Sequence, residues 1–462
     1  MSAAAPGEAL AALWRLAGLP QKALGWAHLT GSDPVYPSSF AVATAAQSTI
    51  AAAALAACEL GHARGSERQR VGVDAVHAAT ECLGWFSVDG RVPQLWDAFS
   101  GLYRSRDGWV RVHANFQHHR EGALRLLGLD PAGADRKAAE QAMLSWDAQA
   151  FEDAAAQAGL VASALRSFAQ WDATEAGRAI AGQPLFTIAR IGEAAPLELS
   201  PLSARQPPLD GVRVLDLTRI LAGPVGGRAL AAYGADVMLV NGPHLPNIEA
   251  IADTSRGKRS ALVDLRTAEG RAHMDTLLDG AHVFVQGYRP GALRQLGYGP
   301  EEVAARRPGI VQVSLCAYGT QGPWQDRRGF DSLVQTAMGF NLAEAEAAGD
   351  PSRPRALPMQ ILDQATGYLI AFGAAAALWR QQQEGGSWHV QVSLAQTAHW
   401  LRALGRVPNG FAVTPPDLEP FLETTASRFG ALRAVRHSAV LGRTPATWRR
   451  PSERPGDSPS RW

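Results

Sequence analysis

The chain has 462 residues, enough for two or three domains with full hydrophobic cores. Its 44 Lys and Arg residues nearly balance 43 Asp and Glu residues, which gives a formal net charge of +1. A charge this small argues against bulk binding to nucleic acid or to an anionic membrane surface.

Membrane and metal-binding classes are also disfavoured. No segment approaches about 18 consecutive apolar residues without a polar interruption, and the first residues lack the basic and apolar regions of a secretory signal. Cys58, Cys82 and Cys316 lie in apolar surroundings without CxxC or metal-ligand spacing, so we expect reduced core cysteines and no metal site. We therefore expect a cytoplasmic, soluble protein.

The first 200 residues divide into two predicted parts. Residues 1–83 form a helical segment, with an Ala/Leu helix, a turn at 31–34, a second Ala-rich helix and a strand at 70–74. A hairpin at 102–113 and helices near 117–127, 135–159 and 173–182 predict a smaller, lid-like α+β domain over 84–200. The Pro- and Ser-rich stretch 201–208 is typical of a linker.

Strands and helices alternate in the predicted domain 209–405. Strands are expected at 212–217, 236–240, 282–285 and 310–314, and helices at 225–233 and 268–279. This alternation predicts an α/β fold with a doubly wound, mostly parallel, Rossmann-like sheet. Residues 406–462 are expected to form an irregular C-terminal tail, disordered over the Arg-, Pro- and Ser-rich stretch 443–462.

Four loops are expected at the carboxyl ends of strands, where open α/β sheets bind ligands. The loop at 217–224 takes the place of a GxGxxG loop but lacks that pattern, which disfavours NAD. The others are at 256–260, 287–291 and 317–323, and the first two place Arg or Lys beside glycine, which suits a phosphate-bearing ligand. Any one basic loop is more often solvated surface.

Asp363 stands at the head of a strongly apolar helix predicted at 358–380, which carries no charge from Gln364 to Leu378. Such a helix is expected to be buried nearly all round. Two interpretations remain open for the carboxylate. It is an N-cap of the helix, or it is a nucleophile that the helix dipole and backbone N–H groups keep ionised and aimed into a cleft.

The chain also contains a weak internal repeat. A shift of 319 residues aligns 65–73 with 384–392 and places the Ala-rich helix at 49–58 near the helix at 368–377. The position equivalent to Asp363 is then Thr44 or a neighbour, and no acidic residue lies between Pro34 and Glu59. One copy of the helix kept the carboxylate and the other lost it.

The motifs from residue 208 to about 404 resemble, in order, those of the family III CoA-transferases. This family includes formyl-CoA and carnitine CoA-transferases and, as a divergent branch, α-methylacyl-CoA racemase. The matching motifs are LDGVRVLDLTRILAGP at 209–224, GADV at 234–237, RGKRSALVDL at 256–265, RPGALRQLG at 289–297, YGTQGP at 318–323, GFD at 329–331, the helix with Asp363, and VQVSL at 390–394.

The resemblance implies that Asp363 is the nucleophile of an acyl-CoA:carboxylate CoA-transferase, which works through aspartyl anhydride and aspartyl-CoA thioester intermediates. It implies a coenzyme A thioester as substrate, a carboxylic acid as acceptor, no permanently bound cofactor, and a homodimer, possibly interlocked. It also implies that CoA is gripped by Leu221, Ala222, Val263, Asp264, Leu265, Arg266, Gly287, Tyr288, Arg289, Arg328, Phe330 and Asp331.

Three features depart from the family pattern. Asn241 follows the second strand where many relatives have Glu, and Phe330 stands where the racemase branch has a histidine. The second change disfavours proton shuttling at a racemised carbon. Residues 35–200 resemble the half that follows the catalytic helix in the family, yet here they precede the CoA-binding half, a permuted order that a trimmed tandem duplication would explain.

Two questions stay open at this point. His113, His118 and His119 in the 84–200 segment are expected to be surface or structural residues, with a contact to the acyl group as the alternative. The alternative functions are an acyl-CoA racemase or isomerase with Asp363 as base, and a non-catalytic CoA-binding protein.

Overall fold

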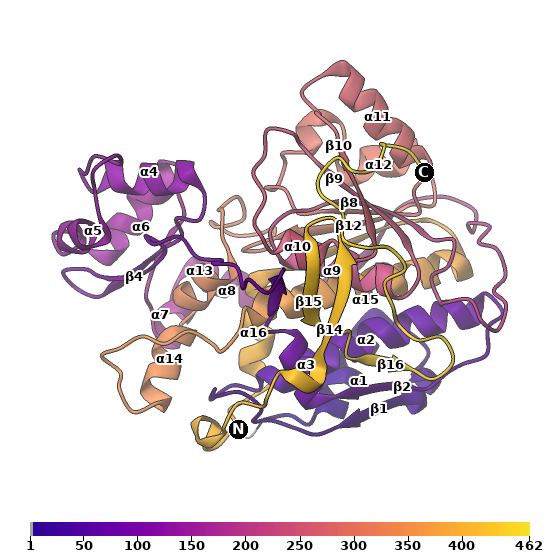
Figure 1. Cartoon of the computed structure of the whole chain (residues 1–462), viewed down its shortest axis with the longest axis horizontal. Helices are drawn as coiled ribbons and strands as arrows, with labels where there is room; N and C mark the ends of the chain where they lie inside the picture. Colours follow the sequence, from indigo (N-terminus) through magenta and orange to yellow (C-terminus); the bar gives the residue numbers. More distant parts are fainter. Residues whose placement is uncertain (1–2) are drawn as a thin grey trace.

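The computed structural model describes residues 3–462 and is built around one seven-stranded sheet (Figure 1). The strand order is β10-β9-β8-β11-β12-β13-β7, and all neighbours are parallel except β7, which is antiparallel to β13. The bounds are β7 Phe186–Gly192, β8 Arg213–Leu217, β9 Asp236–Asn241, β10 Lys258–Leu262, β11 Val283–Gln286, β12 Val311–Cys316 and β13 Ser387–Ser393. The doubly wound, mostly parallel α/β fold predicted from the sequence is confirmed.

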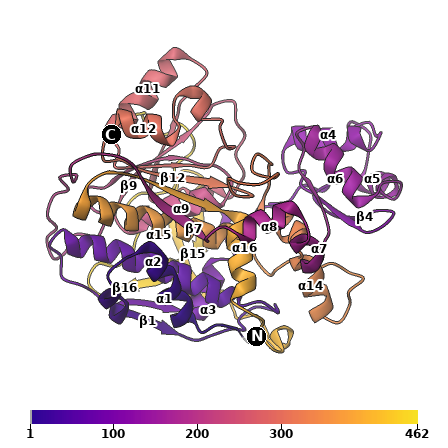
Figure 2. The ribbon, with the colours of Figure 1, turned by 180° about the vertical axis from the view of Figure 1, so that it is seen from behind.

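Helices cover both faces of this sheet, because successive residues of its buried strands point to opposite sides. On β8, Val214 packs into the core shared with α9, α15 and α2, whereas Leu215 packs into a second core under α11 and α12. Seen from either side, α11 and α12 lie above the sheet and α15, α2 and α1 lie below it (Figures 1 and 2). Their bounds are α1 Pro6–Ala17, α2 Val42–Ala63, α9 Ala222–Ala232, α11 Ala268–Asp279, α12 Pro300–Arg306 and α15 Ile361–Glu384.

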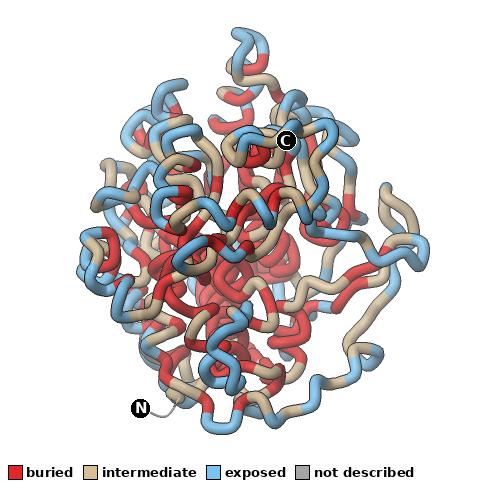
Figure 3. The backbone as a smooth tube through the Cα atoms, turned by 90° about the vertical axis from the view of Figure 1, so that its left-hand side faces the viewer, coloured by how far each residue is buried: buried red, intermediate tan, exposed pale blue. Residues whose placement is uncertain are grey.

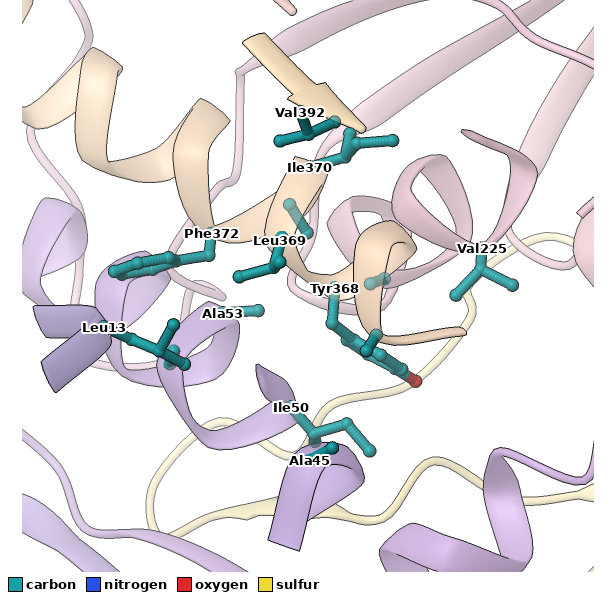
Figure 4. Close-up of a cluster of buried hydrophobic side chains, with 14 of the residues drawn as sticks. Leu13, Ala45, Ile50, Ala53, Val225, Tyr368, Leu369, Ile370, Phe372 and Val392 are labelled. Carbon is teal, nitrogen blue, oxygen red and sulfur yellow. The ribbon is translucent and has the colours of Figure 1, made fainter. Parts of the chain in front are cut away.

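Two long apolar helices, α2 and α15, pack along each other below the sheet (Figure 4). Small residues such as Ala45 and Ala53 on α2 allow the close approach, and Leu369 and Phe372 of α15 reach toward α2. Both helices are long and apolar enough to cross a membrane by length and composition, yet their apolar stretches are entirely buried inside the protein. The red core of Figure 3 shows how deeply the centre of the chain is enclosed.

Each of the two apolar helices is followed in the chain by a strand and then by another helix. After α2 come β2 (Val71–Asp74) and α3 (Ala75–Glu81), and after α15 come β13 and α16 (Leu394–Ala403). Thr44 is the third residue of α2, and Asp363 is the third residue of α15. The Asp33 carboxylate accepts the backbone N–H groups of Ala43 and Thr44 in the first turn of α2. The order helix, strand, helix agrees with the internal repeat in the sequence.

A small unit with its own core lies to one side of the main sheet, at the left of Figure 1. Its antiparallel sheet has the order β4-β5-β6 and is covered by three short helices. We expected the whole range 84–200 to be lid-like, but Phe186–Gly192 forms the edge strand β7 of the main sheet. The elements of the range are β3 Phe86–Val88, β4 Gly101–Arg104, β5 Trp109–Val112, β6 Ala162–Ala164, α4 Gln117–Leu126, α5 Arg136–Met143, α6 Ala148–Gln157, α7 Phe168–Asp172 and α8 Glu175–Ala181.

The C-terminal segment is ordered, in contrast to the irregular, disordered tail expected from its composition. Strand β15 pairs with β3, and β16 pairs with β2, so the segment ties into the N-terminal half. The physical reason is two tryptophans: the indole N–H of Trp448 donates to Arg228 O at 3.0 Å, and that of Trp462 donates to Leu277 O at 2.7 Å. Both rings pack against the hydrophobic cores. The strands are β14 Leu422–Ser427, β15 Gly430–Val435 and β16 Ala439–Leu441.

The remaining short elements connect these parts: β1 Ala27–Thr30, which pairs with β2, the helices α10 Ile251–Thr254, α13 Asp331–Ala337 and α14 Phe340–Ala347, and the 3-10 turns η1 Gln21–Trp26, η2 Arg294–Leu296, η3 Gly410–Ala412 and η4 Glu419–Phe421.

Candidate active site

A cavity of about 400 Å³ opens at the carboxyl ends of β8 and β11. The order in which strands are added to the sheet reverses there. From β8, β9 and β10 are added on one side, and β11 and β12 are added on the other. Such a switch point is where open α/β sheets bind ligands. Of the residues that the resemblance assigned to CoA, those that line the cavity are Leu221, Ala222, Gly287, Tyr288, Arg289, Arg328 and Phe330.

Asp363 lies in the wall of this cavity, at the first turn of α15. Its exposed fraction is 8%, so the carboxyl group is nearly buried but reachable from the cavity. The residue is not the N-cap of the helix, because Gln360 takes that position. Within residues 3–462, no hydrogen bond is found to the carboxylate oxygens of Asp363.

The capping role belongs instead to Asp331, which comes from the start of α13. Asp331 Oδ2 accepts the backbone N–H of Asp363 at 3.0 Å, and Oδ1 accepts the side-chain amide of Gln335 at 2.5 Å. Capping interactions of this kind satisfy the free N–H groups of a helix. The prediction that Asp363 caps its own helix is therefore wrong, and its carboxylate is left free for other chemistry.

Burial raises the pKa of both carboxyl groups. Burial raises the pKa of Asp363 well above its usual value, and the negative charge of Asp331 raises it further. Burial also raises the pKa of Asp331, to about 6, although hydrogen bonds from the backbone of Asp363 and from Gln335 oppose this. The expectation that the helix N-terminus holds Asp363 ionised is wrong in direction, because desolvation outweighs the helix dipole.

Histidines from the small unit form another part of the wall. His118 and His119 of α4 line the cavity, whereas His113 lies behind it and stacks on Phe330 with ring centroids 3.9 Å apart. Burial lowers the pKa of His113 to about 4 and that of His119 to about 3, the latter helped by neighbouring His118 and Arg328. His113 and His119 are buried, whereas His118 is exposed, so the expectation of surface or structural histidines agrees with His113 and His118. His118 and His119 line the cavity, which keeps the alternative of a contact with the acyl group open.

Four of the residues assigned to CoA lie farther away. Val263, Asp264, Leu265 and Arg266 follow β10, two strands from β8, and do not line the cavity. Arg266 forms an ion pair with Asp264 at 2.7 Å on the surface. Asp331 also lies outside the cavity wall, behind Asp363.

Asn241, at the end of β9, is almost fully buried between these positions. Its side-chain amide donates to Thr218 O at 3.4 Å, and its Oδ1 accepts from the side chain of Asn247 at 3.0 Å. The residue that departs from the family pattern thus links the loops after β8 and β9 to each other.

The basic loop predicted at 256–260 does not lie at the carboxyl edge. It leads into the amino end of β10, a strand that the sequence analysis missed. Arg256 and Lys258 are buried and neutralised by Asp253 and Asp216 respectively. The sequence pattern did not predict β10, because the strand begins with charged residues. The acidic side chains that neutralise them are distant in sequence.

Several wall residues were missed by sequence reasoning. Phe116 comes from the small unit, and most of the others lie at or after the carboxyl ends of strands. For Leu245 and Pro246, the signal that could have found them is their place in the loop after β9. Ile220 adopts φ 78°, a left-handed conformation that a branched residue rarely takes, at the turn into α9. The lining residues outside the predicted loops and the assigned positions are Phe116, Leu245, Pro246, Ala292, Leu315, Cys316, Arg327 and Leu394.

The described chain, residues 3–462, contains no group of three or more His, Cys, Asp and Glu side chains arranged to hold a metal ion. The side chains that line the cavity supply one carboxyl group, two imidazoles and several guanidinium groups.

Comparison with known proteins identifies the segment that carries this cavity. The family model of CoA-transferase family III matches residues 209–405. A probable fatty acyl-CoA transferase of Mycobacterium tuberculosis is 35% identical over 217 residues, or 44% of this chain and 54% of the relative. Succinate–glutarate CoA-transferase of Agrobacterium fabrum is 30% identical over 246 residues, or 47% of this chain and 60% of the relative. Succinyl-CoA:glutarate CoA-transferase of Mus musculus is 34% identical over 192 residues, or 39% and 43%.

Solved structures give partial overlaps. A crystal structure of a hypothetical protein from Mycobacterium tuberculosis has a TM-score of 0.39 at 33% identity, and covers 46% of this chain and 57% of that one. A CAIB/BAIF family protein from Brucella suis has a TM-score of 0.38 at 26% identity, with 49% and 65% covered. The chain spans about half the length of the curated relatives it matches.

Proposed function

We propose that this chain, whose residues 209–405 belong to CoA-transferase family III, is an acyl-CoA:carboxylate CoA-transferase that works through covalent intermediates on Asp363. The observation that carries the proposal is the position of Asp363. It is a carboxyl group free of hydrogen bonds within the described chain, in the wall of a cavity at the switch point of the sheet. Such a group is placed to attack a bound thioester.

The first step forms an anhydride. A carboxylate oxygen of Asp363 attacks the carbonyl carbon of the donor acyl-CoA, the carbon–sulfur bond breaks, and CoA leaves as a thiolate. The thiolate then attacks the aspartyl carbonyl of the mixed anhydride, which gives an aspartyl-CoA thioester and releases the donor acid as a carboxylate. Both steps conserve charge, and no external energy source is needed because the acyl-transfer potentials of thioester and anhydride are comparable.

The second half of the reaction reverses these steps with another acid. The acceptor carboxylate attacks the carbonyl carbon of the aspartyl-CoA thioester, and CoA thiolate leaves again. The thiolate attacks the acceptor carbonyl of the new anhydride, which releases the acceptor acyl-CoA and restores the Asp363 carboxylate. The anhydride has to be shielded from water during both halves, and the apolar side chains in the cavity wall, such as Leu221 and Phe330, suit that task.

The electrostatics of the carboxyl pair set the conditions for attack. The raised pKa of Asp363 makes its ionised form more basic, and therefore more nucleophilic, than an ordinary carboxylate. Since no group within residues 3–462 forms a hydrogen bond to the carboxylate, few interactions have to be broken before it attacks. Below its pKa the group carries a proton and does not attack, so the reaction proceeds from the ionised form.

The proposed binding mode divides the CoA contacts into two groups. Gly287, Tyr288 and Arg289, together with Leu221 and Ala222, would hold the thioester end, because they share the cavity wall with Asp363. The residues after β10, 263–266, would contact the end of CoA that is farthest from the thioester, because they lie two strands away along the same edge.

We also propose a homodimer, and light scattering after size exclusion tests it.

A second candidate is an acyl-CoA racemase or isomerase with Asp363 as the base. The observation that favours it is His119, a neutral imidazole in the wall of the same cavity, which would return a proton to the substrate. The third interpretation is a non-catalytic CoA-binding protein.

One experiment separates the three. The protein is incubated with an acyl-CoA, treated with hydroxylamine, and digested, and the modified peptide is mapped by mass spectrometry. The CoA-transferase proposal expects a hydroxamate on Asp363, no hydroxamate in Asp363→Asn, and wild-type behaviour in Asp326→Asn, which makes the same change on an exposed loop residue. Transfer that proceeds while Asp363 stays unmodified contradicts the covalent mechanism. Deuterium exchange at the acyl α-carbon without exchange of CoA supports the isomerase, and binding without either reaction supports the inert module.

A further inference from the structure

Arg111 connects the small unit to α13, the helix that begins at Asp331. On β5, Val110 and Val112 belong to the core of the small unit, so Arg111 between them points to the opposite face of the strand. There its Nε donates to Oγ1 of Thr336, a fully buried residue of α13, at 3.0 Å. The small unit thus contacts α13 through a charged side chain.

Further hydrogen bonds lead from Thr336 to the backbone of Asp363. Thr336 Oγ1 donates to Asn341 Oδ1 at 2.5 Å, and Asn341 Nδ2 donates to Gln335 Oε1 at 3.4 Å. Gln335 Nε2 donates in turn to Asp331 Oδ1, and Asp331 Oδ2 accepts the N–H of Asp363. The side chains between Arg111 and Asp363 are all buried, with exposed fractions of 1% or less. Buried hydrogen-bond networks make the groups that they join rigid, so the position of Arg111 affects that of Asp363.

Arg111 also supplies positive charge to Asp331. Burial raises the pKa of Asp331 to about 6, and the charge of Arg111 is among the influences that oppose this rise. Burial lowers the pKa of Arg111 to about 10, so the guanidinium keeps its charge at neutral pH. An ionised carboxylate forms stronger hydrogen bonds than a neutral carboxyl group. The charge of Arg111 therefore strengthens the bond between Asp331 and the N–H of Asp363.

Other ionisable side chains on the elements packed against α13 are engaged elsewhere. These elements are β5, β6, α14, α15 and α16. Glu344 of α14 accepts the N–H of Ser39 at 2.9 Å, and Arg402 of α16 pairs with Asp172 at 2.7 Å. The remaining ionisable residues on these elements are Glu346 on α14, Asp363, Arg380 and Glu384 on α15, and His399 on α16.

We propose that Arg111 is a positioning residue for Asp363, which fixes Asp331 as the cap of α15 and thereby couples the seat of the small unit to the position of the nucleophile. This inference rests on the proposed function, in which Asp363 attacks the thioester. Arg111 does not line the cavity, so it acts through Asp331 and not on the substrate.

Four variants separate the charge of Arg111 from its hydrogen bond. Arg111→Lys keeps the charge, Arg111→Gln keeps a hydrogen-bond donor without the charge, and Arg111→Met keeps neither. The matched control is Arg104→Gln, which makes the same change at an exposed position of β4 in the same unit. Circular dichroism confirms that each variant is folded.

The first measurement is the rate at which an acyl-CoA and hydroxylamine give the hydroxamate of Asp363. We expect Arg111→Met to lower this rate about 10- to 100-fold, because a misplaced nucleophile reacts slowly, and Arg111→Lys to recover at least about 5-fold of the loss. The affinity for free CoA, measured by calorimetry, should stay within about 2-fold of the wild type. In an Asp331→Asn background, Arg111→Gln should change the rate by less than about 2-fold, since the two residues act together.

The second measurement is independent of turnover. Carbon-13 NMR follows the titration of the aspartate carboxyl carbons, and Asp331→Asn assigns the signal of Asp331. We expect the pKa of Asp331 to rise by about 1 unit in Arg111→Gln and in Arg111→Met, and to stay near the wild-type value in Arg111→Lys. A residue that only packs against α13 would not produce this pattern.

The outcomes distinguish this inference from the proposed function. A wild-type rate in Arg111→Met overturns the positioning role and leaves the transferase proposal standing. Equal losses in the Met, Gln and Lys variants with an unmoved titration of Asp331 indicate packing alone and also overturn it. If the wild type forms no hydroxamate, the covalent mechanism is contradicted, and the NMR titration alone then decides whether Arg111 acts on Asp331. If Arg111→Met does not fold, the Lys and Gln variants decide by the same criteria.

Discussion

Lys258 and Asp216 form an ion pair inside the protein that holds one wall of the cavity in place. Both side chains are fully buried, with Nζ 2.8 Å from Asp216 Oδ2. Nζ also donates to Pro224 O at 2.8 Å, in the first turn of α9. The pair thus fixes the turn between β8 and α9, which carries Leu221 and Ala222 of the cavity.

Replacing Lys258 by Met keeps the length of the side chain and removes its charge. The Asp216 carboxylate is then left buried with one hydrogen bond, from Thr218, and Pro224 O loses its donor. Breaking a buried pair by removing one partner costs about 3–5 kcal/mol, whereas removing both charges is often nearly neutral. We expect Lys258→Met to lose about 3–5 kcal/mol of unfolding free energy, and Asp216→Asn with Lys258→Met to recover at least about 2 kcal/mol of it.

Urea unfolding followed by tryptophan fluorescence and circular dichroism measures both values. The control is Lys137→Met, which makes the same change at an exposed position of α5 and should stay within about 0.5 kcal/mol of the wild type. A loss below about 1 kcal/mol for Lys258→Met, or a double variant no more stable than the single one, would refute the reasoning.

Three further predictions concern the site and the tail. A Cβ on Gly367 would lie 2.6 Å from a backbone oxygen of α9, so Gly367→Ala must displace α15. If the proposed function holds, this variant should lower kcat/KM for acyl transfer about 10- to 100-fold. Gly7→Ala, with nothing within 4 Å of the added Cβ, should leave it unchanged. Full activity in the first variant would contradict the close packing. The value of kcat/KM should fall at acidic pH as Asp363 gains its proton. Asp331→Asn should move this acidic limb to lower pH, because the charge of Asp331 raises the pKa of Asp363. An unmoved limb, or a move to higher pH, would contradict the coupling between the two carboxyl groups. Trp448→Ala should cost about 3 kcal/mol in the same urea assay, whereas a disordered tail would show no change.

The sequence predicted the central fold well because its information there is local. Buried parallel strands read as short Val- and Leu-rich runs, and the loops that follow them locate the binding edge. Strand β10 was missed because it begins with Lys258 and Arg259, whose acidic partners lie elsewhere in the chain. The ordered structure of the C-terminal segment was missed for the same reason. Its two tryptophans donate hydrogen bonds to the backbone oxygens of Arg228 and Leu277, which are distant in sequence.

The site was predicted in part. Asp363 was found from the charge pattern of its own helix, but its electrostatics were not, because the capping carboxylate is 32 residues upstream and both groups are buried together. Desolvation is a property of the packed structure, and no local pattern reports it. His119 could be singled out as a residue but not placed, because its position depends on how the small unit meets the sheet.

The packing of α2 along α15 has a consequence for how the chain is made. Helix α2 ends at residue 63 and α15 begins at residue 361, so most of the protein is synthesised before the apolar face of α2 meets its partner. Contacts between segments this distant in sequence form slowly, and an apolar helix that stays exposed in the meantime is prone to aggregate. The N-terminal part is further tied to strands after residue 421, so this pairing forms only after those strands have been synthesised. A ribosome-bound intermediate should accordingly depend on chaperones that shield α2 until α15 has been synthesised.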